Sequence, residues 1–204
     1  MEIIKINPQD PDKETIKHAI NVLEDGGTVV YPTDTVYGLG ANILSEKAIK
    51  NVYSIKKRTY DKPVSVCVSR IEDITEYACL DKKGEEIVNK ILPGPFTIIL
   101  NKKGSVCSLL TAGGDKIGIR IPDSIVCREL TKKFPITSTS ANLSGKKVPH
   151  SIEEVIEQLD DLVDLILDAG KSSGTPSTVI DLTSDPPKIL RKSSLSLNLN
   201  ELIG

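Results

Sequence analysis

Thr28-Val29-Val30-Tyr31 leads directly into Pro32-Thr33-Asp34-Thr35-Val36-Tyr37-Gly38-Leu39-Gly40. The β-branched and aromatic residues of the first run favour a buried strand. Pro32 ends that strand, because proline cannot donate a hydrogen bond to the ladder. The polar residues that follow are therefore predicted to form a loop at a strand end. Ligands often bind at such strand ends in α/β sheets, so this loop is a candidate ligand-binding segment.

Helices and strands alternate on both sides of this loop. Asp12, Ser45 and Ser124 each precede an apolar pattern of helical period, so they are predicted helix caps, and the last of these helices runs to Phe134. Further helices are predicted over 84–92 and 151–159. Predicted strands cover 28–31, 64–68, 96–100, 117–121, 135–139, 162–167, 177–182 and 188–190. Several strands follow one another without a helix, which favours a mixed α/β sheet in one domain, residues 1–204.

The composition argues against several classes of protein. The chain has 204 residues and a formal net charge of −2, so no global positive field would attract a polyanion. Five Tyr, two Phe and no Trp leave few rings on which nucleic-acid bases could stack. The four cysteines match no zinc or redox spacing and are expected to be reduced, mostly buried thiols. His18 and His150 lie far apart in the chain, and no metal site is predicted.

No targeting or membrane signal is recognisable. The N-terminus has no basic-then-apolar leader, and no stretch approaches the roughly 20 apolar residues that a membrane helix needs. The protein is therefore expected in the cytoplasm, without a membrane partner.

Basic residues gather between positions 50 and 70, where the only acid is Asp61; they are Lys50, Lys56, Lys57, Arg58, Lys62 and Arg70. Such a cluster can hold a phosphate chain by charge-assisted hydrogen bonds. A solvated helix C-terminus, where cations interact well with the helix dipole, explains it equally well. Arg120 lies inside an apolar strand, where an unpaired charge is costly, so it should meet an anion or a carboxylate. Arg191 ends a similar run, and a protein carboxylate such as Asp181 could be the partner of either arginine.

Six motifs, in order along nearly the whole chain, resemble those of the YrdC-like threonylcarbamoyl-adenylate synthases. They are Pro32-Thr33-Asp34-Thr35-Val36-Tyr37-Gly38-Leu39, Lys56-x-Arg58 with Lys62-Pro63, Pro93-Gly94-Pro95-Phe96-Thr97, Gly118-Ile119-Arg120-Ile121-Pro122, Ser138-Thr139-Ser140-Ala141-Asn142-Leu143-Ser144-Gly145 and Pro176-Ser177-Thr178-Val179-Ile180-Asp181. The resemblance implies a twisted mixed α/β sheet with flanking helices around a positively lined concave cavity. It is a resemblance to the short, single-domain form of the family.

The resemblance also implies an activity. Members of this family convert L-threonine, bicarbonate and ATP into L-threonylcarbamoyl-AMP and pyrophosphate, the first step toward N6-threonylcarbamoyladenosine (t6A) in tRNA. The enzyme would then be a nucleotidyltransferase with ATP as a substrate, accompanied by Mg²⁺. Its downstream partners would be the proteins that transfer threonylcarbamoyl to tRNA, with at most a weak contact to tRNA itself. An RNA-binding module that uses the basic concavity is the alternative.

The same resemblance assigns roles to particular residues. Lys56 and Arg58 are the implied catalytic residues. The implied L-threonine-binding residues are Thr35, Cys67, Arg120, Ser138 and Ser177. The implied ATP-binding residues are Lys56, Arg58, Lys62, Ser140, Asn142, Ser144 and Arg191. Two positions depart from the family: Cys67 stands where a histidine is common, and Arg191-Lys192-Ser193 replaces an Arg-x-Gly segment.

Overall fold

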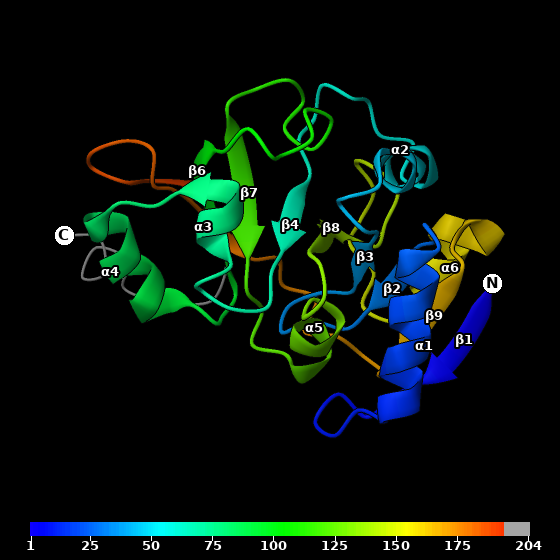
Figure 1. Ribbon diagram of the computed structural model, residues 1–204. Helices are drawn as coiled ribbons and strands as arrows, with labels where there is room; N and C mark the ends of the chain where they lie inside the picture. Colours follow the sequence, from blue (N-terminus) through cyan, green and yellow to red (C-terminus); the bar gives the residue numbers. More distant parts are fainter. Residues whose placement is uncertain (194–204) are drawn as a thin grey trace.

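A computed structural model describes residues 1–193 (Figure 1), so residues 194–204 of the expected domain lie outside the described residues. The strands are β1 (Glu2–Lys5), β2 (Val29–Tyr31), β3 (Gly38–Gly40), β4 (Ser65–Cys67), β5 (Ala78–Cys79), β6 (Phe96–Lys102), β7 (Lys116–Arg120), β8 (Ile136–Ser140), β9 (Leu165–Asp168), β10 (Thr178–Asp181) and β11 (Lys188–Arg191). The helices are α1 (Lys13–Glu24), α2 (Glu46–Ile55), α3 (Ile74–Tyr77), α4 (Lys82–Ile91), α5 (Ile125–Leu130) and α6 (Ile152–Leu159), with a 3-10 turn after α6 at Asp160–Leu162.

The described strands join in one mixed sheet, as predicted. Their order is β1-β9-β2-β3-β8-β4-β7-β6-β10-β11, with β5 beside β6. Strand β9 is parallel to β1 and β2, β4 is parallel to β7, and β6 is parallel to β10. The remaining pairs are antiparallel. Consequently the N-terminal strand β1 and the late strand β11 lie at opposite ends of the sheet (Figure 1).

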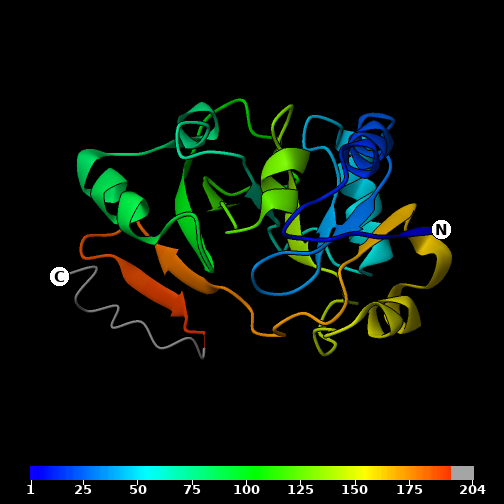
Figure 2. The ribbon, with the colours of Figure 1, turned by 90° about the horizontal axis from the view of Figure 1, so that it is seen from below.

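Helices cover both faces of the β9-β2 end of the sheet. Val29 and Tyr31 of β2 pack in one core cluster with α1 and α5, whereas Val30 packs in another with α2 and α6. Leu165 and Leu167 of β9 join the first cluster. Successive residues of a strand point to opposite faces, so this end of the sheet is buried on both. Figure 2 shows α1 and α5 on one side of these strands and α6 on the other.

Most predicted elements are confirmed within a few residues. Asp12 caps α1 by accepting from Thr15 N at 2.8 Å, and Ser45 caps α2 by accepting from Ala48 N at 3.2 Å. Helix α4 begins earlier than predicted, because Asp81 accepts from Gly84 N and starts the helix before that glycine. Helix α5 ends at Leu130, well before the predicted Phe134. At this end, the Thr131 hydroxyl donates to the carbonyl of Cys127 in the last turn.

Several elements were not predicted. The segment 38–40 was expected to be a loop, but it is strand β3, which turns back and pairs antiparallel with β2. Strand β1 was missed because three of its four residues are exposed and show no alternation. The short elements α3 and β5 carry too few residues for a periodic pattern.

The Tyr31 ring explains why β3 reads Gly-Leu-Gly. The ring is completely buried and lies across β3, and its hydroxyl donates to Thr137 O at 3.1 Å. A Cβ on Gly38 would stand 2.6 Å from Tyr31 Cζ, and one on Gly40 would stand 2.9 Å from Tyr31 Cε1. Only glycine leaves room for the ring at both positions.

The cysteines are free, as predicted, although only half of them are buried. Cys67 and Cys127 lie in the core, Cys107 is half-buried and Cys79 is exposed.

Within residues 1–193, none of the helices has both the length and the apolar character required to cross a membrane.

We predict that Gly38→Ala destabilises the protein by about 1–3 kcal/mol, because the added methyl group overpacks the Tyr31 ring. Urea unfolding would measure the change. Gly104→Ala is the matched control: a Cβ there meets nothing within 4 Å, so stability should stay within about 0.5 kcal/mol of the parent. An unchanged midpoint for Gly38→Ala would mean that the ring does not constrain β3.

Candidate active site

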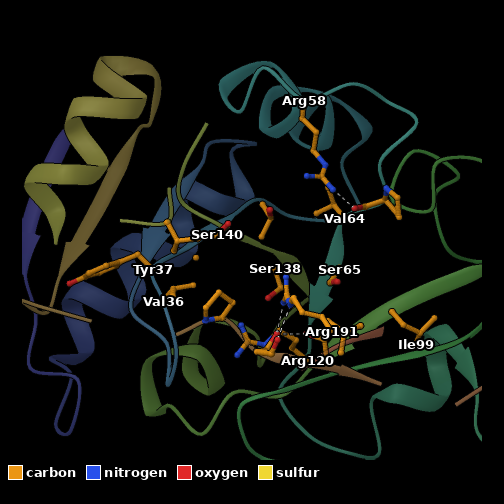
Figure 3. A pocket seen from close by; sticks show the side chains of 18 residues that line it. Val36, Tyr37, Arg58, Val64, Ser65, Ile99, Arg120, Ser138, Ser140 and Arg191 are labelled. Carbon is orange, nitrogen blue, oxygen red and sulfur yellow. Dashed lines mark hydrogen bonds between the residues drawn. The ribbon is translucent and has the colours of Figure 1, made fainter. Parts of the chain in front are cut away.

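A cavity of about 290 Å³ opens where the β2–β3 loop, the start of β4 and the strands β6, β7, β8, β10 and β11 come together. In the part of the chain that the structure describes, its lining contains the arginines Arg58, Arg120 and Arg191 and no carboxylate. Figure 3 shows Arg120 and Arg191 close to Ser138 at one end of the cavity, with Arg58 at the other end. The cavity thus offers two separate positions for negative charge.

Arg120 is the last residue of β7 and only 7 % exposed. Its Nη2 donates to Asp34 Oδ1 and to Thr35 Oγ1, both at 3.0 Å. The carboxylate that Arg120 was predicted to need is therefore Asp34. Asp181, the example that the sequence suggested, pairs with Lys116. Burial raises the pKa of Asp34, and the charge of Arg120 opposes that rise. Nε of Arg120 is buried and has no partner among residues 1–193, which is a position that a ligand acceptor would satisfy.

Arg191, at the end of β11, is held by Ser177. Its Nε donates to Ser177 O at 3.0 Å and its Nη2 to Ser177 Oγ at 3.1 Å. The Ser177 hydroxyl in turn bonds to Thr97 Oγ1 at 2.8 Å. Burial and the nearby charge of Arg120 both lower the pKa of Arg191. Two guanidinium groups therefore share this end of the cavity, and an anion placed between them would relieve their repulsion.

Arg58 follows α2 after Lys57, whose φ of 48° turns the chain out of the helix. The Arg58 side chain donates to Lys62 O at 3.2 Å and to Pro63 O at 2.8 Å. These bonds hold the guanidinium beside the cavity without neutralising it. Its charge is thus available to a ligand.

The Lys56 side chain holds the turn after β8 through hydrogen bonds to Ser140 and Asn142. Its side chain is 2 % exposed, and Nζ donates to Ser140 O, to Asn142 O at 2.7 Å and to Asn142 Oδ1 at 3.4 Å. The Ser140 hydroxyl also donates to Asn142 Oδ1. Burial, with a contribution from the charge of Arg58, lowers the pKa of Lys56 to about 7. Within residues 1–193, the three oxygens that accept from this ammonium are carbonyl and amide oxygens.

The loop after β2 is rigid because its polar groups bond to one another and to the segment after β9. Thr33 Oγ1 accepts from Thr35 N at 3.0 Å and donates to Val36 O at 2.7 Å. The Tyr37 hydroxyl donates to Gly170 O at 2.7 Å and accepts from Ala169 N at 2.9 Å. Burial raises the pKa of Tyr37 to about 12, so this phenol stays neutral near pH 7.

The structure brings together six of the residues named from the sequence, which line the cavity: Arg58, Arg120, Ser138, Ser140, Ser177 and Arg191. Four more sit directly behind them. Thr35 bonds to Arg120, Lys56 and Asn142 hold Ser140, and Ser144 N donates to Lys56 O at 2.8 Å.

Two of the named residues lie away from the cavity lining. The Lys62 side chain is exposed, and only its carbonyl contacts Arg58. Cys67 is fully buried in the core with Cys127 and Tyr31. Sequence reasoning in turn missed the role of Asp34 and of Thr97, although both belong to motifs that it had singled out. Among residues 1–193, no cluster of His, Cys, Asp or Glu could hold a metal ion by itself.

Comparisons with known proteins agree with this architecture. The crystal structure of Pyrococcus abyssi Sua5 complexed with L-threonine has a TM-score of 0.94 and 34 % identity, covering 100 % of this chain and 61 % of that one. The crystal structure of Escherichia coli YciO has a TM-score of 0.89 and 28 % identity, covering 97 % of this chain and 98 % of that one.

Sequence relatives cover most of the chain. A protein of Methanocaldococcus jannaschii is 39 % identical over 91 % of this chain and 88 % of its own length. The threonylcarbamoyl-AMP synthase of Pyrococcus abyssi is 36 % identical over 93 % of this chain, which spans only 57 % of that relative. Residues 21–193 match the Sua5/YciO/YrdC family, whose description reads "Telomere recombination". The chain therefore belongs to the Sua5/YciO/YrdC family.

Proposed function

We propose that the protein is an L-threonylcarbamoyladenylate synthase, a nucleotidyltransferase that converts L-threonine, bicarbonate and ATP into L-threonylcarbamoyl-AMP and pyrophosphate. One observation carries the proposal: within residues 1–193, the cavity has two arginines at one end, a third at the other and no carboxylate in its lining. An amino-acid carboxylate and a triphosphate need cations at separate positions of this kind. The product would enter the first step of t6A formation in tRNA.

The relatives support this assignment. The Pyrococcus abyssi relative is named a threonylcarbamoyl-AMP synthase, and its Sua5 structure was solved with L-threonine. This chain spans 57 % of that relative. One sheet joins the strands of residues 1–193, and we propose in addition that residues 1–204 act as a single domain. The comparisons do not favour the alternative of an RNA-binding module.

Arg120 and Ser177 would bind the amino acid. The unpartnered Nε of Arg120 is a donor for the α-carboxylate, and the Ser177 hydroxyl is already fixed between Thr97 and Arg191. Ser138 lines the same end of the cavity and adds a hydroxyl. Thr35 would act through Arg120, because it holds Nη2.

Arg58 and the turn held by Lys56 would bind the nucleotide. Arg58 supplies an un-neutralised charge for the phosphates, and Ser140 lines the cavity from the turn. Arg191 could reach a phosphate only from the amino-acid end, so we assign it to the junction of the two substrates. The described residues offer no carboxylate cluster for Mg²⁺, and the ion would arrive with the triphosphate.

The proposed reaction needs little acid or base from the protein. The threonine amine and bicarbonate give a carbamate and water. A carbamate oxygen then attacks the α-phosphorus of ATP, and the bond to pyrophosphate breaks. Orientation of the two substrates and stabilisation of charge on the phosphates would supply most of the catalysis. Downstream, proteins that transfer threonylcarbamoyl to tRNA would consume the product, with at most a weak contact of this protein to tRNA.

We predict that pyrophosphate release from ATP and bicarbonate requires L-threonine. L-serine should react more slowly, by about 10–200-fold, because it lacks one methyl group that the cavity wall can contact. A coupled pyrophosphate assay with each amino acid would measure both rates. Binding of ATP without pyrophosphate release for any amino acid would contradict the proposed function.

Arg58→Ala should lower kcat/KM by roughly 10- to 150-fold, because one charge-assisted hydrogen bond to the phosphates is lost. Lys57→Asn is the matched control. It removes the neighbouring positive charge at an exposed position that does not line the cavity, and asparagine tolerates the left-handed backbone there. Activity of Arg58→Ala within about twofold of the parent would remove Arg58 from the site.

ATP binding at pH 8 should take up a proton at Lys56. With a pKa of about 7, Lys56 is mostly neutral at pH 8 in the free protein, and nearby phosphates raise the pKa of an ammonium group. Calorimetry in buffers of different ionisation enthalpy would show uptake approaching one proton per ATP, and Lys56→Met should abolish it. Equal uptake by the parent and Lys56→Met would show that Lys56 does not sense the nucleotide.

A further inference from the structure

Asp34 determines which donors of Arg120 remain for a ligand. Asp34 and Thr35 together account for both N–H groups of Nη2. Among residues 1–193, Nε has no partner, and the side-chain bonds of Arg120 to Asp34 and Thr35 both come from Nη2. The two charged side chains are 8 % and 11 % exposed, so they have little freedom to rearrange. Nε–H and Nη1 lie on different edges of the guanidinium, so a ligand carboxylate would accept from one of them, in the orientation that Asp34 and Thr35 fix.

The Asp34 carboxylate is itself anchored independently of Arg120. Its second oxygen, Oδ2, accepts from the backbone N–H of Asp123 at 3.1 Å. That N–H belongs to the segment just before α5. Arg120 is thus attached to a fixed point, and it does not merely share a mobile ion pair.

The charges at this end of the cavity can be counted. Within residues 1–193, the cavity arginines Arg120 and Arg191 carry two positive charges, and Asp34, the carboxylate paired with Arg120, carries one negative charge, which leaves a sum of +1. An amino-acid carboxylate carries one negative charge, whereas a phosphate group carries about 1.5 to 2 near pH 7. The sum therefore matches a carboxylate. Without Asp34 the sum would be +2 and would match a phosphate.

We propose that Asp34 is a positioning residue that orients Arg120 and sets the charge at this end of the cavity, so that an amino-acid carboxylate binds there and pyrophosphate is rejected. The inference rests on the proposed function, which puts a carboxylate and a triphosphate into one cavity of about 290 Å³. In so small a space, phosphates bound at the Arg120–Arg191 end would block the amino acid. Asp34 keeps them at the Arg58 end.

Asp34→Asn tests this inference, because it is nearly isosteric, removes the charge and replaces one acceptor oxygen by an NH2 group. We expect the KM for L-threonine to rise at least 10-fold and the KM for ATP to stay within about twofold. We also expect pyrophosphate to inhibit competitively against L-threonine about 10-fold more tightly than in the parent. A purely structural loss would lower the melting temperature and raise both KM values without tighter inhibition.

Asp123→Asn is the matched control. It removes the same charge from a neighbouring position, but the Asp123 side chain is exposed and only its backbone N–H bonds to Asp34. Both KM values and the pyrophosphate inhibition should equal those of the parent.

Asp34→Glu distinguishes the effect of the position of the carboxylate from the effect of its charge. It is also the test to use if Asp34→Asn does not fold. It keeps the negative charge but moves it by one methylene. The KM for L-threonine should rise while pyrophosphate inhibition stays at the level of the parent. Tighter inhibition in Asp34→Glu, or an unchanged L-threonine KM in either variant, would overturn the inference.

The proposed function and the role of Asp34 are contradicted by different outcomes. If the parent protein releases no pyrophosphate with L-threonine, the proposed function fails. If the parent is active and Asp34→Asn shows unchanged pyrophosphate inhibition, only the role of Asp34 fails. Calorimetric titration of each protein with L-threonine and with pyrophosphate gives the same comparison without turnover: Asp34→Asn should bind L-threonine more weakly and pyrophosphate more tightly than the parent, and unchanged affinities would overturn the inference.

Discussion

Burying the charge of Arg120 is the constraint on which the rest of the site depends. An arginine at the end of an apolar strand is costly unless its charge is paired and its N–H groups are bonded. Asp34 and Thr35 provide both, and they come from the β2–β3 loop. That loop and β7 are separated in the sheet by β8 and β4. The contact that makes Arg120 tolerable therefore also draws the loop over the cavity.

The two buried cations near the cavity are stabilised in different ways. Arg120 is paired with a carboxylate and keeps its charge, because a guanidinium does not lose its proton in proteins. In the described part of the chain, Lys56 donates to carbonyl and amide oxygens, and burial lowers its pKa to about 7. One end of the cavity therefore has a fixed charge, and the other can gain charge when an anion arrives. This asymmetry suits a site in which one ligand is a carboxylate and the other a polyphosphate.

The sequence predicted what depends on local pattern and missed what depends on contacts between distant segments. The caps Asp12 and Ser45, the apolar faces of the helices and most strands are local, and they were found. Strand β3 was missed because two glycines in so short a segment are typical of a turn. The reason for them, the Tyr31 ring that lies across the strand, is a tertiary contact. The need of Arg120 for an anion was predicted from its burial. Its partner, Asp34, lies 86 positions away, and no spacing rule reaches that far.

The chemistry of the lining limits how the site can work. The described residues line the cavity with arginines, hydroxyl groups and apolar side chains, and they contribute no carboxylate, imidazole or thiol to it. His18 is bonded to Glu2 at 2.8 Å on the surface, and Cys67, where the family often has a histidine, is buried in the core. None of the side chains that line the cavity is a general base with a pKa near 7. In the proposed reaction, rate acceleration would come from the orientation of the two substrates and from arginine charges placed where negative charge accumulates. Selectivity for the side chain of the amino acid would come from the shape of the cavity wall around Arg120.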